Sequence, residues 1–462
     1  MRSLLARINP RIRQDAVSGE SAWDPPGQEG ESLPIARRRP LTTHWQGGHR
    51  KFTVTKTVII CGKLFDGLSD KALGPTEILI EDGTIAEVSS SVGRPDGAKV
   101  FDLSDRTVSP GFIDTHVHLC VNGLNLARQT LQCSPAKALA GLHYAQQYMR
   151  YGFTTLRDMG TLDPEWPTIN LRDAIDTGMA RGPRLIVAAH MISATAGHGD
   201  MQGMFPCRCH MGLSRVADSP AKIRELVRME HAFGGDWIKT MNTGGYMSAG
   251  DDPARVTWFE DEMLALGHTA QQLGLPLAVH TGAAEGCKQA LRAGARSLEH
   301  CYLIDDEGIA MAEKAGAFLV PTMQMTREDK ALLLAGSLPE HVVWKFRRDV
   351  MAIEEAQRRI ARSEAKVAYG TDCGMFPFSE GVLEFQAMVA AGLTPARALK
   401  AGTSVAAELL QREDLGVLAP GKQADIVAMQ GDPFKDIAAT AKIDFVMKAG
   451  RVYRHGFFDL LQ

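Results

Sequence analysis

The chain has 462 residues, of which 45% are hydrophobic and 23% are charged, with a formal net charge of −3 at pH 7. This composition excludes a disordered or fibrous protein, and the near-neutral charge gives no electrostatic footprint for nucleic acid. Runs of 18 or more apolar residues are absent, which excludes a membrane span. We therefore expect a soluble protein that binds neither nucleic acid nor membranes.

The eight cysteines are spread thinly through the sequence and no secretory leader precedes them. This distribution is not that of a disulfide framework, so we expect a reducing, cytoplasmic location. Cys207 and Cys209, followed by His210, form the one tight group. They fit either two reduced cysteines in a loop or a metal site that lacks its second half.

Residues 1–52 are rich in Arg, Pro, Gly, Ser and Glu and show no sustained apolar period. We expect a disordered extension there, with a transit peptide as the alternative. Residues 53–109 change to strand patterns, including a hairpin in which Asp82 and Gly83 form the turn. Residues 413–462 repeat this style. The two segments are predicted to share a small β-sandwich domain around a different central domain.

Residues 110–412 alternate short apolar runs with helical stretches such as 261–273 and 350–363. This alternation predicts an α/β fold, a (β/α)8 TIM-type barrel. A doubly wound sheet is the alternative, but the glycine-rich phosphate turn expected after its first strand is missing. The eight predicted strands are 112–118, 154–158, 184–190, 237–241, 276–281, 297–301, 318–322 and 367–372.

Histidines and other ionisable residues recur near the ends of these predicted strands, where barrel active sites are built. His116 and His118 are separated by one residue, so both rings project from one side of the first strand. One histidine at a strand end is more often a hydrogen-bonded residue than a ligand, but the whole set predicts a metal site. The set is His116, His118, Lys239, His280, His300 and Asp372.

Four neutral imidazoles and a carboxylate suit zinc or a similar divalent ion, and two such ions can share a bridging hydroxide. An aspartate beside that hydroxide can accept its proton and deliver it to a leaving group. Lys239 is the unusual member, because an ammonium repels metals. As a neutral amine it could react with carbon dioxide and form a carbamate, a carboxylate-like bridging ligand.

The motifs at these positions resemble those of the amidohydrolase superfamily. Residues 111–118 resemble its first-strand motif, and residues 278–280, 298–300 and 370–372 match its fifth, sixth and eighth strands. Residues 416–427 resemble the return of the chain to the family's small β-sandwich. The resemblance covers about residues 54–455 and leaves the N-terminal extension unmatched.

The resemblance implies two metal ions, with zinc first and manganese, cobalt or iron as alternatives. His116, His118 and Asp372 would bind the more buried ion, and His280 and His300 the second. Lys239, carboxylated, would bridge the two ions, and Asp372 would also be the general acid and base. Superfamily members with a fourth-strand lysine are typically binuclear hydrolases, so Lys239 favours hydrolysis over deamination.

Two loops, at residues 193–200 and 241–253, resemble the branch with Xaa-Pro dipeptidases, ochratoxin-type amidases and imidazolonepropionase-like proteins. This resemblance places His198 beside the substrate carbonyl, while the structural alternative is a histidine that holds its loop. Arg157 and Asp158 are interpreted as a structural ion pair at the barrel mouth. Met323, Met325 and Arg327 are candidates for the pocket wall.

We expect a binuclear metal-dependent hydrolase, an amidohydrolase that cleaves amide-type C–N bonds of small molecules such as N-acyl amino acids or dipeptide-like compounds. A metal-bridging hydroxide would attack the carbonyl carbon. The alternative is a hydrolase of carbamates, thiocarbamates or phenylureas at the same site, and a non-catalytic scaffold is the alternative from another class. Relatives with this architecture commonly assemble, so a homo-oligomer is expected.

Overall fold

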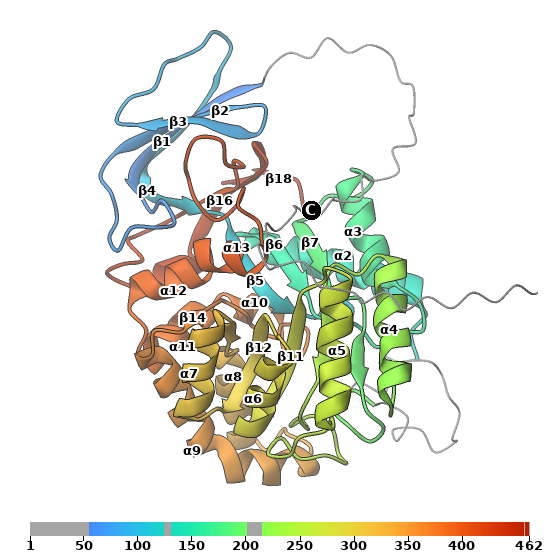
Figure 1. Ribbon diagram of the computed structural model, residues 1–462. Helices are drawn as coiled ribbons and strands as arrows, with labels where there is room; N and C mark the ends of the chain where they lie inside the picture. The colour runs from blue at the N-terminus through green and yellow to red at the C-terminus, as the bar shows by residue number, and fades with distance from the viewer. Residues whose placement is uncertain (1–54, 124–130, 201–214, 457, 462) are drawn as a thin grey trace, which may run out of the picture. The chain divides into compact units, whose positions relative to one another are not determined.

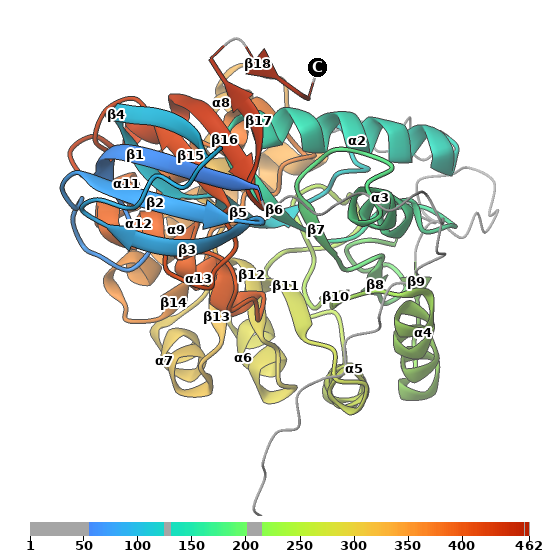
Figure 2. The same cartoon turned by 90° about the horizontal axis from the view of Figure 1, so that it is seen from above.

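The computed structural model describes residues 55–123, 131–200, 215–456 and 458–461. Strands from the two ends of this part of the chain form one eight-stranded sheet (Figures 1 and 2). In spatial order its strands are β18 (Phe458–Asp459), β17 (Arg451–His455), β16 (Ile443–Lys448), β15 (Ile426–Met429), β4 (Lys99–Pro110), β1 (Lys56–Leu64), β2 (Thr76–Glu81) and β3 (Thr84–Ser89).

The predicted hairpin is confirmed, because β2 and β3 pair antiparallel with Glu81 opposite Thr84. Both turn residues, Asp82 and Gly83, have positive φ, as a tight two-residue hairpin requires. The two ends of the chain meet where β15 pairs with β4, with Ile426 opposite Pro110. The shared terminal β-structure is thus confirmed, whereas its sandwich form and the domain boundaries stay predictions.

The middle of the chain contributes parallel strands in two further sheets. The seven-stranded sheet has the order β14 (Lys366–Val367), β13 (Phe318–Val320), β12 (Ser297–Leu303), β11 (Leu277–Ala283), β10 (Ile238–Met241), β8 (Met191–Ser193) and β9 (Arg215–Val216). The three-stranded sheet has the order β5 (Phe112–Val117), β6 (Phe153–Asp158) and β7 (Arg184–Val187).

Helices follow these strands, and α4 to α7 lie in a row along one side of strands β8 to β13 (Figure 2). This alternation of strand and helix is the predicted α/β pattern. The helices are α2 (Ser134–Arg150), α3 (Pro167–Asp176), α4 (Pro220–Phe233), α5 (Glu260–Gln272), α6 (Ala284–Arg292), α7 (Asp306–Ala315), α8 (Met323–Leu334), α9 (Glu340–Arg362), α10 (Phe378–Gly381), α11 (Glu384–Ala391), α12 (Pro395–Ala401) and α13 (Ser404–Leu409), with a 3-10 turn at η2 (Ile437–Ala441).

Three boundaries differ from the sequence predictions by three residues or more. The third predicted strand, 184–190, ends at Val187 as β7, and a separate strand, β8, begins at Met191. The eighth is only Lys366–Val367, so Asp372 lies in the segment after the strand rather than at its end. Helix α9 begins at Glu340 instead of 350, because its buried face starts at Val342.

Backbone hydrogen bonds join the edges of the two parallel sheets. The segment after β14 runs beside β5, where Tyr369 and Cys373 accept bonds from the amides of Thr115 (2.9 Å) and His118 (2.7 Å). At the other edge, β7 leads through three residues into β8. These contacts have the direction that a closed eight-stranded barrel requires, and the closed barrel itself stays a prediction.

Among the described helices, none is both long and apolar enough to cross a membrane. The predicted extension at residues 1–52 and the group of Cys207, Cys209 and His210 lie outside the described residues.

The fully buried Phe112 ring tests the packing of β5 against the core. Its centroid lies 5.7 Å from that of Phe153 and 4.9 Å from that of Phe385. Phe112→Ala should lower the free energy of unfolding by about 3–5 kcal/mol, because the cavity it leaves cannot be refilled. Urea unfolding measures this loss. Leu139→Ala, at a 70% exposed helix position, is the matched control and should change little; equal effects of the two changes would contradict this packing.

Candidate functional site

Three predicted residues form a compact buried group at the end of β5. The ligand atoms of His116, His118 and Asp372 all lie within 4.8 Å of one another. The Nε2 atoms of His116 and His118 lie 3.5 and 3.3 Å from Oδ1 of Asp372. Two imidazoles and one carboxylate at this spacing can hold a divalent metal ion.

The other ring nitrogen of each histidine determines where its proton lies. Nδ1 of His116 contacts Oε2 of Glu299 at 2.7 Å, and Nδ1 of His118 contacts the carbonyl oxygen of Gly160 at 2.7 Å. Both partners are acceptors, so each Nδ1 carries a proton and each Nε2 faces Asp372. Buried Nε2 of His116 has no hydrogen-bond partner among the described atoms, which fits a site built for a cation.

Glu299 anchors this arrangement, and sequence reasoning identified it only as part of a motif. Its Oε1 pairs with the Arg157 guanidinium at 2.9 Å, and both side chains are fully buried. The interpretation of Arg157 and Asp158 as an ion pair is therefore wrong. Asp158 instead accepts hydrogen bonds from the amides of Leu119 (2.8 Å) and Gly160 (3.0 Å), since successive strand residues point to opposite sides.

A second buried carboxylate, Asp114, fixes β5 against the segment that carries Asp372. It accepts hydrogen bonds from the hydroxyls of Tyr148 and Thr371, each at 2.7 Å, and from the amide of His116 at 2.9 Å. Burial raises its pKa to about 7. The sequence identified Asp114 only as part of the first-strand motif, because its partners Tyr148 and Thr371 are remote in the chain.

The remaining predicted histidines lie next to this group. The ring centroid of His300 is 4.8 Å from that of His116 and 4.6 Å from that of His280. His198 in turn lies 4.5 Å from His280. The structure thus brings together histidines of β5, β11 and β12 and of the loop after β8.

Burial determines the charge of these rings. It lowers the pKa of His116, His280 and His300 well below the ordinary value, and neighbouring cationic groups add to the effect. The rings are therefore neutral, which is the form that binds metal ions. Burial also acts on His118, but the hydrogen bond and charge of Asp372 outweigh it and raise the pKa of that ring.

Lys239 lies in β10, fully buried, and its side chain lines the same cavity as the histidines. Burial lowers the pKa of its amine to about 8 despite the charges of Glu299 and Asp372. Within the described part of the chain no hydrogen bond or ion pair to this amine is found. A buried amine with a lowered pKa and no partner is chemically suited to modification.

Two of the predicted ligands occupy strained backbone. His300 and Asp372 both have φ of 67°, and Thr322, which contacts Nδ1 of His300 at 2.9 Å, has φ of 45°. Each non-glycine residue in this left-handed region costs about 1–2 kcal/mol. Such strain is retained where surrounding contacts fix the chain and a side chain must be directed into a functional site.

His198, in the loop after β8, is held by a chain of polar contacts. Its Nδ1 lies 2.8 Å from the hydroxyl oxygen of Ser248, which donates to Asp251, and Asp251 pairs with Lys345 at 3.0 Å. Because Ser248 uses its proton on Asp251, it accepts from Nδ1, and the neutral ring presents Nε2 as an acceptor. Burial lowers the pKa of His198, so donation to a carbonyl oxygen would require a disfavoured second proton.

A cavity with an empty volume of about 690 Å³, including space open to solvent, is lined by six of the predicted residues: His118, His198, Lys239, His280, His300 and Asp372. Much of its wall is apolar, with methionines and two tyrosines. Met325 lines it as predicted, whereas Met323 is buried elsewhere and Arg327 is exposed. The described lining residues beside the predicted set are Val121, Leu162, Met191, Gly199, Met241, Tyr246, Met247, Tyr302, Met325, Asp329 and Met375.

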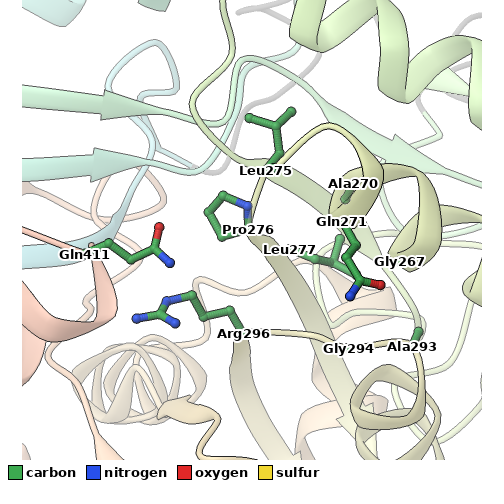
Figure 3. Close-up of a pocket in the computed structure, with 11 residues that line it drawn as sticks. Gly267, Ala270, Gln271, Leu275, Pro276, Leu277, Ala293, Gly294, Arg296 and Gln411 are labelled. Atoms are coloured by element: carbon green, nitrogen blue, oxygen red, sulfur yellow. The ribbon is translucent and has the colours of Figure 1, made fainter. Parts of the chain in front are cut away.

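A second pocket lies at the opposite, amino-terminal ends of β11 and β12, with Gln411 facing Pro276 and Arg296 (Figure 3). The Arg296 guanidinium donates to the carbonyl oxygens of Leu409 (2.8 Å) and Glu408 (2.7 Å). Side chains at the amino-terminal ends of barrel strands serve stability. The contacts of Arg296 in this pocket are of that structural kind.

Comparison with known proteins agrees with this geometry. The amidohydrolase family model matches residues 107–453. Ochratoxinase from Aspergillus niger is 26% identical over 428 residues, covering 86% of each chain. A crystal structure of a Xaa-Pro dipeptidase with bound methionine is 31% identical, covers 87% of this chain and 100% of its own, and has a TM-score of 0.81. Molinate hydrolase, at 23% identity, 87% and 95% coverage and a TM-score of 0.71, shares the fold.

The fold and site thus define a hydrolase with a buried group of metal-ligating side chains. The family model covers well over half of the sequence, and the chain belongs to the amidohydrolase family. It is therefore an enzyme that hydrolyses carbon–nitrogen bonds. A TIM-type barrel with an extra domain is the architecture that its structural neighbours imply.

The buried pair of Arg157 and Glu299 gives a stability test. Glu299→Gln leaves the guanidinium without its carboxylate and should lower the free energy of unfolding by about 3–5 kcal/mol. Glu285→Gln removes one of the two carboxylate partners of the half-exposed Arg292, which keeps Glu260, and should have little effect. Urea unfolding of both variants measures the difference, and equal small losses would mean that the buried pair does not anchor the site.

Proposed function

We propose that this enzyme cleaves amide-type C–N bonds of small molecules, N-acyl amino acids or dipeptide-like compounds, with the help of two divalent metal ions. The observation that carries the proposal is the buried group of His116, His118 and Asp372, with both Nε2 atoms directed at the carboxylate. The Xaa-Pro dipeptidase, a relative named for cleavage of a peptide bond, supports the choice of bond.

His116, His118 and Asp372 would hold one ion, and His280 and His300 the second. Neutral imidazoles and a carboxylate suit zinc first, with manganese, cobalt and iron as further candidates. The closeness of the His116 and His300 rings supports two neighbouring sites. When bound, the ions would supply Lewis acidity toward the carbonyl oxygen and lower the pKa of water.

Lys239 would bridge the two ions after reaction with carbon dioxide. Its neutral amine attacks the carbon of CO2, an N–C bond forms, and one proton is released to give an anionic carbamate. The lowered pKa provides the neutral amine near pH 8, and the absence of a described partner leaves the nitrogen free to react.

Asp372 would be the general base and acid. Burial opposes its ionisation, but the His118 hydrogen bond and the charges around it lower the pKa of this carboxyl below the ordinary value. The ionised carboxylate can take a proton from the attacking water and deliver it to the leaving nitrogen. His198 would contact the substrate through Nε2, which accepts a hydrogen bond from a substrate N–H while the ring is neutral.

The closed barrel is part of this proposal. Closure of β5 to β14 into one (β/α)8 barrel would direct the proposed metal ligands and His198 to a common mouth. The alternative is hydrolysis of carbamates, thiocarbamates or phenylureas at the same site. A substrate screen would distinguish this activity from amide hydrolysis. Molinate hydrolase supports the shared fold alone.

Metal content tests the bridging role of Lys239. The purified wild type should hold about two divalent ions per chain, and Lys239→Ala should lose both metal and most activity, because the bridge is gone. Elemental analysis by mass spectrometry gives the ratio. Lys314→Ala, on the exposed surface of α7, is the control. About one ion per chain in both proteins would mean that Lys239 is not a bridge.

Replacement of Asp372 separates proton transfer from metal binding. Asp372→Asn keeps an oxygen ligand but cannot carry a proton, so metal content should persist while kcat falls by about 10²–10⁴-fold. The measurement is kcat on a dipeptide-like amide beside metal analysis of the same sample. Full activity in this variant would contradict the assigned role.

A further inference from the structure

Asp329 is an ionisable residue of the cavity wall that the mechanism does not use. It lies in α8, one turn after Met325, and both side chains line the cavity from the same helix face. Asp329 is only 4% exposed. Its carboxyl group is therefore enclosed by protein and open to the substrate space.

This carboxyl group has no partner within the described residues: no hydrogen bond or ion pair to it is found, and only the charges of Asp372 and Glu328 act on it. The other buried acids differ. Glu299 pairs with Arg157, and Glu384 accepts from the amides of Met323 and Gln324. Burial and the charge of Asp372 raise the pKa of the Asp329 carboxyl group to about 7, so a cationic partner from outside the chain would favour its ionised form.

Among the described lining residues, no side chain supplies a cationic partner. Lys239 is the one lysine or arginine among the described lining residues, and it acts on Glu299 and Asp372 rather than on Asp329. In the proposed function it becomes an anionic carbamate. The two ions of the proposed function would be held by other residues, so a positive charge next to Asp329 would come from the substrate.

The other residues of the cavity wall indicate which chemical groups the substrate carries beside its positive charge. Met191, Met241, Met325 and Met375 line the cavity with flexible apolar side chains, and Tyr302 adds an aromatic face. Methionines adapt to aliphatic and aromatic groups of varied shape. A ligand that suits both features has a protonated amine beside an apolar body.

We propose that Asp329 selects substrates that carry a protonated amine, so that dipeptide-like amides with a free amine are preferred over N-acyl amino acids. The carboxylate of Asp329 accepts N–H donors of the ammonium group while the methionine wall covers the apolar side chain. This inference rests on the proposed function, because it names the substrate class of the same site.

The test compares two amides that differ only in the amine. L-methionyl-L-alanine has the ammonium group, and 4-(methylthio)butanoyl-L-alanine has hydrogen in its place. Wild-type enzyme should prefer the first in kcat/KM by about 10- to 100-fold, the usual worth of a hydrogen bond to a charged group. Asp329→Asn should reduce this preference to near one.

Glu328→Gln is the matched control: it removes one negative charge from the adjacent position, which does not line the cavity, and should retain the preference. Asp329→Glu, which keeps the charge, should restore part of it. An unchanged preference in Asp329→Asn would overturn the inference, and so would a wild type with no preference. The second result is the one expected if a neutral Asp329 donates a hydrogen bond to a substrate carbonyl instead.

Direct binding keeps this test separate from the proposed function. Calorimetry with 3-phenylpropylamine and 3-phenylpropanol needs no turnover, and the amine should bind wild type at least about tenfold more tightly than it binds Asp329→Asn, with no such difference for the alcohol. Selective amine binding without hydrolysis of any amide would contradict the proposed reaction alone. Hydrolysis without amine selectivity in either assay would contradict the role of Asp329 alone.

Discussion

The site depends on one buried chain of charge-assisted hydrogen bonds, from Arg157 through Glu299 to His116. Arg157 pairs with Glu299 where both side chains are fully buried, and Glu299 then holds the proton of His116 on Nδ1. The Nε2 lone pair must consequently face Asp372. Without the Glu299 carboxylate, neither the tautomer nor the orientation of the His116 ring would be fixed. The geometry of the ligand group therefore depends on this interaction.

Strained backbone supplies the complementary constraint, because regular strands alone would not direct the remaining groups inward. His300, within β12, and Asp372, after β14, adopt positive φ, and Asp114 with Thr371 secures the segment that carries Asp372. The regular strands thus provide rigidity, while the positive-φ positions direct these two side chains. This division is common to barrels, where chemistry resides at the carboxyl ends of strands.

The sequence predicted what short-range patterns encode. Spacing of two placed His116 and His118 together, and the strand–helix alternation located Lys239, His280 and His300 on successive units. Asp372 was expected in a strand but lies beyond one, since β14 has only two residues. The roles of Glu299 and Asp329 could not be predicted from the sequence. Glu299 depends on Arg157, which is remote in the chain, and Asp329 lies in a helix, where no local pattern marks a residue that lacks a partner in space.

Anomalous X-ray diffraction at the zinc edge, from crystals grown with zinc, would locate the metal ions directly. We expect two peaks, one among His116, His118 and Asp372 and the other beside His280 and His300. Electron density for a carboxylated Lys239 should lie between them. A single peak beside an unmodified Lys239, or peaks away from these residues, would contradict the binuclear site.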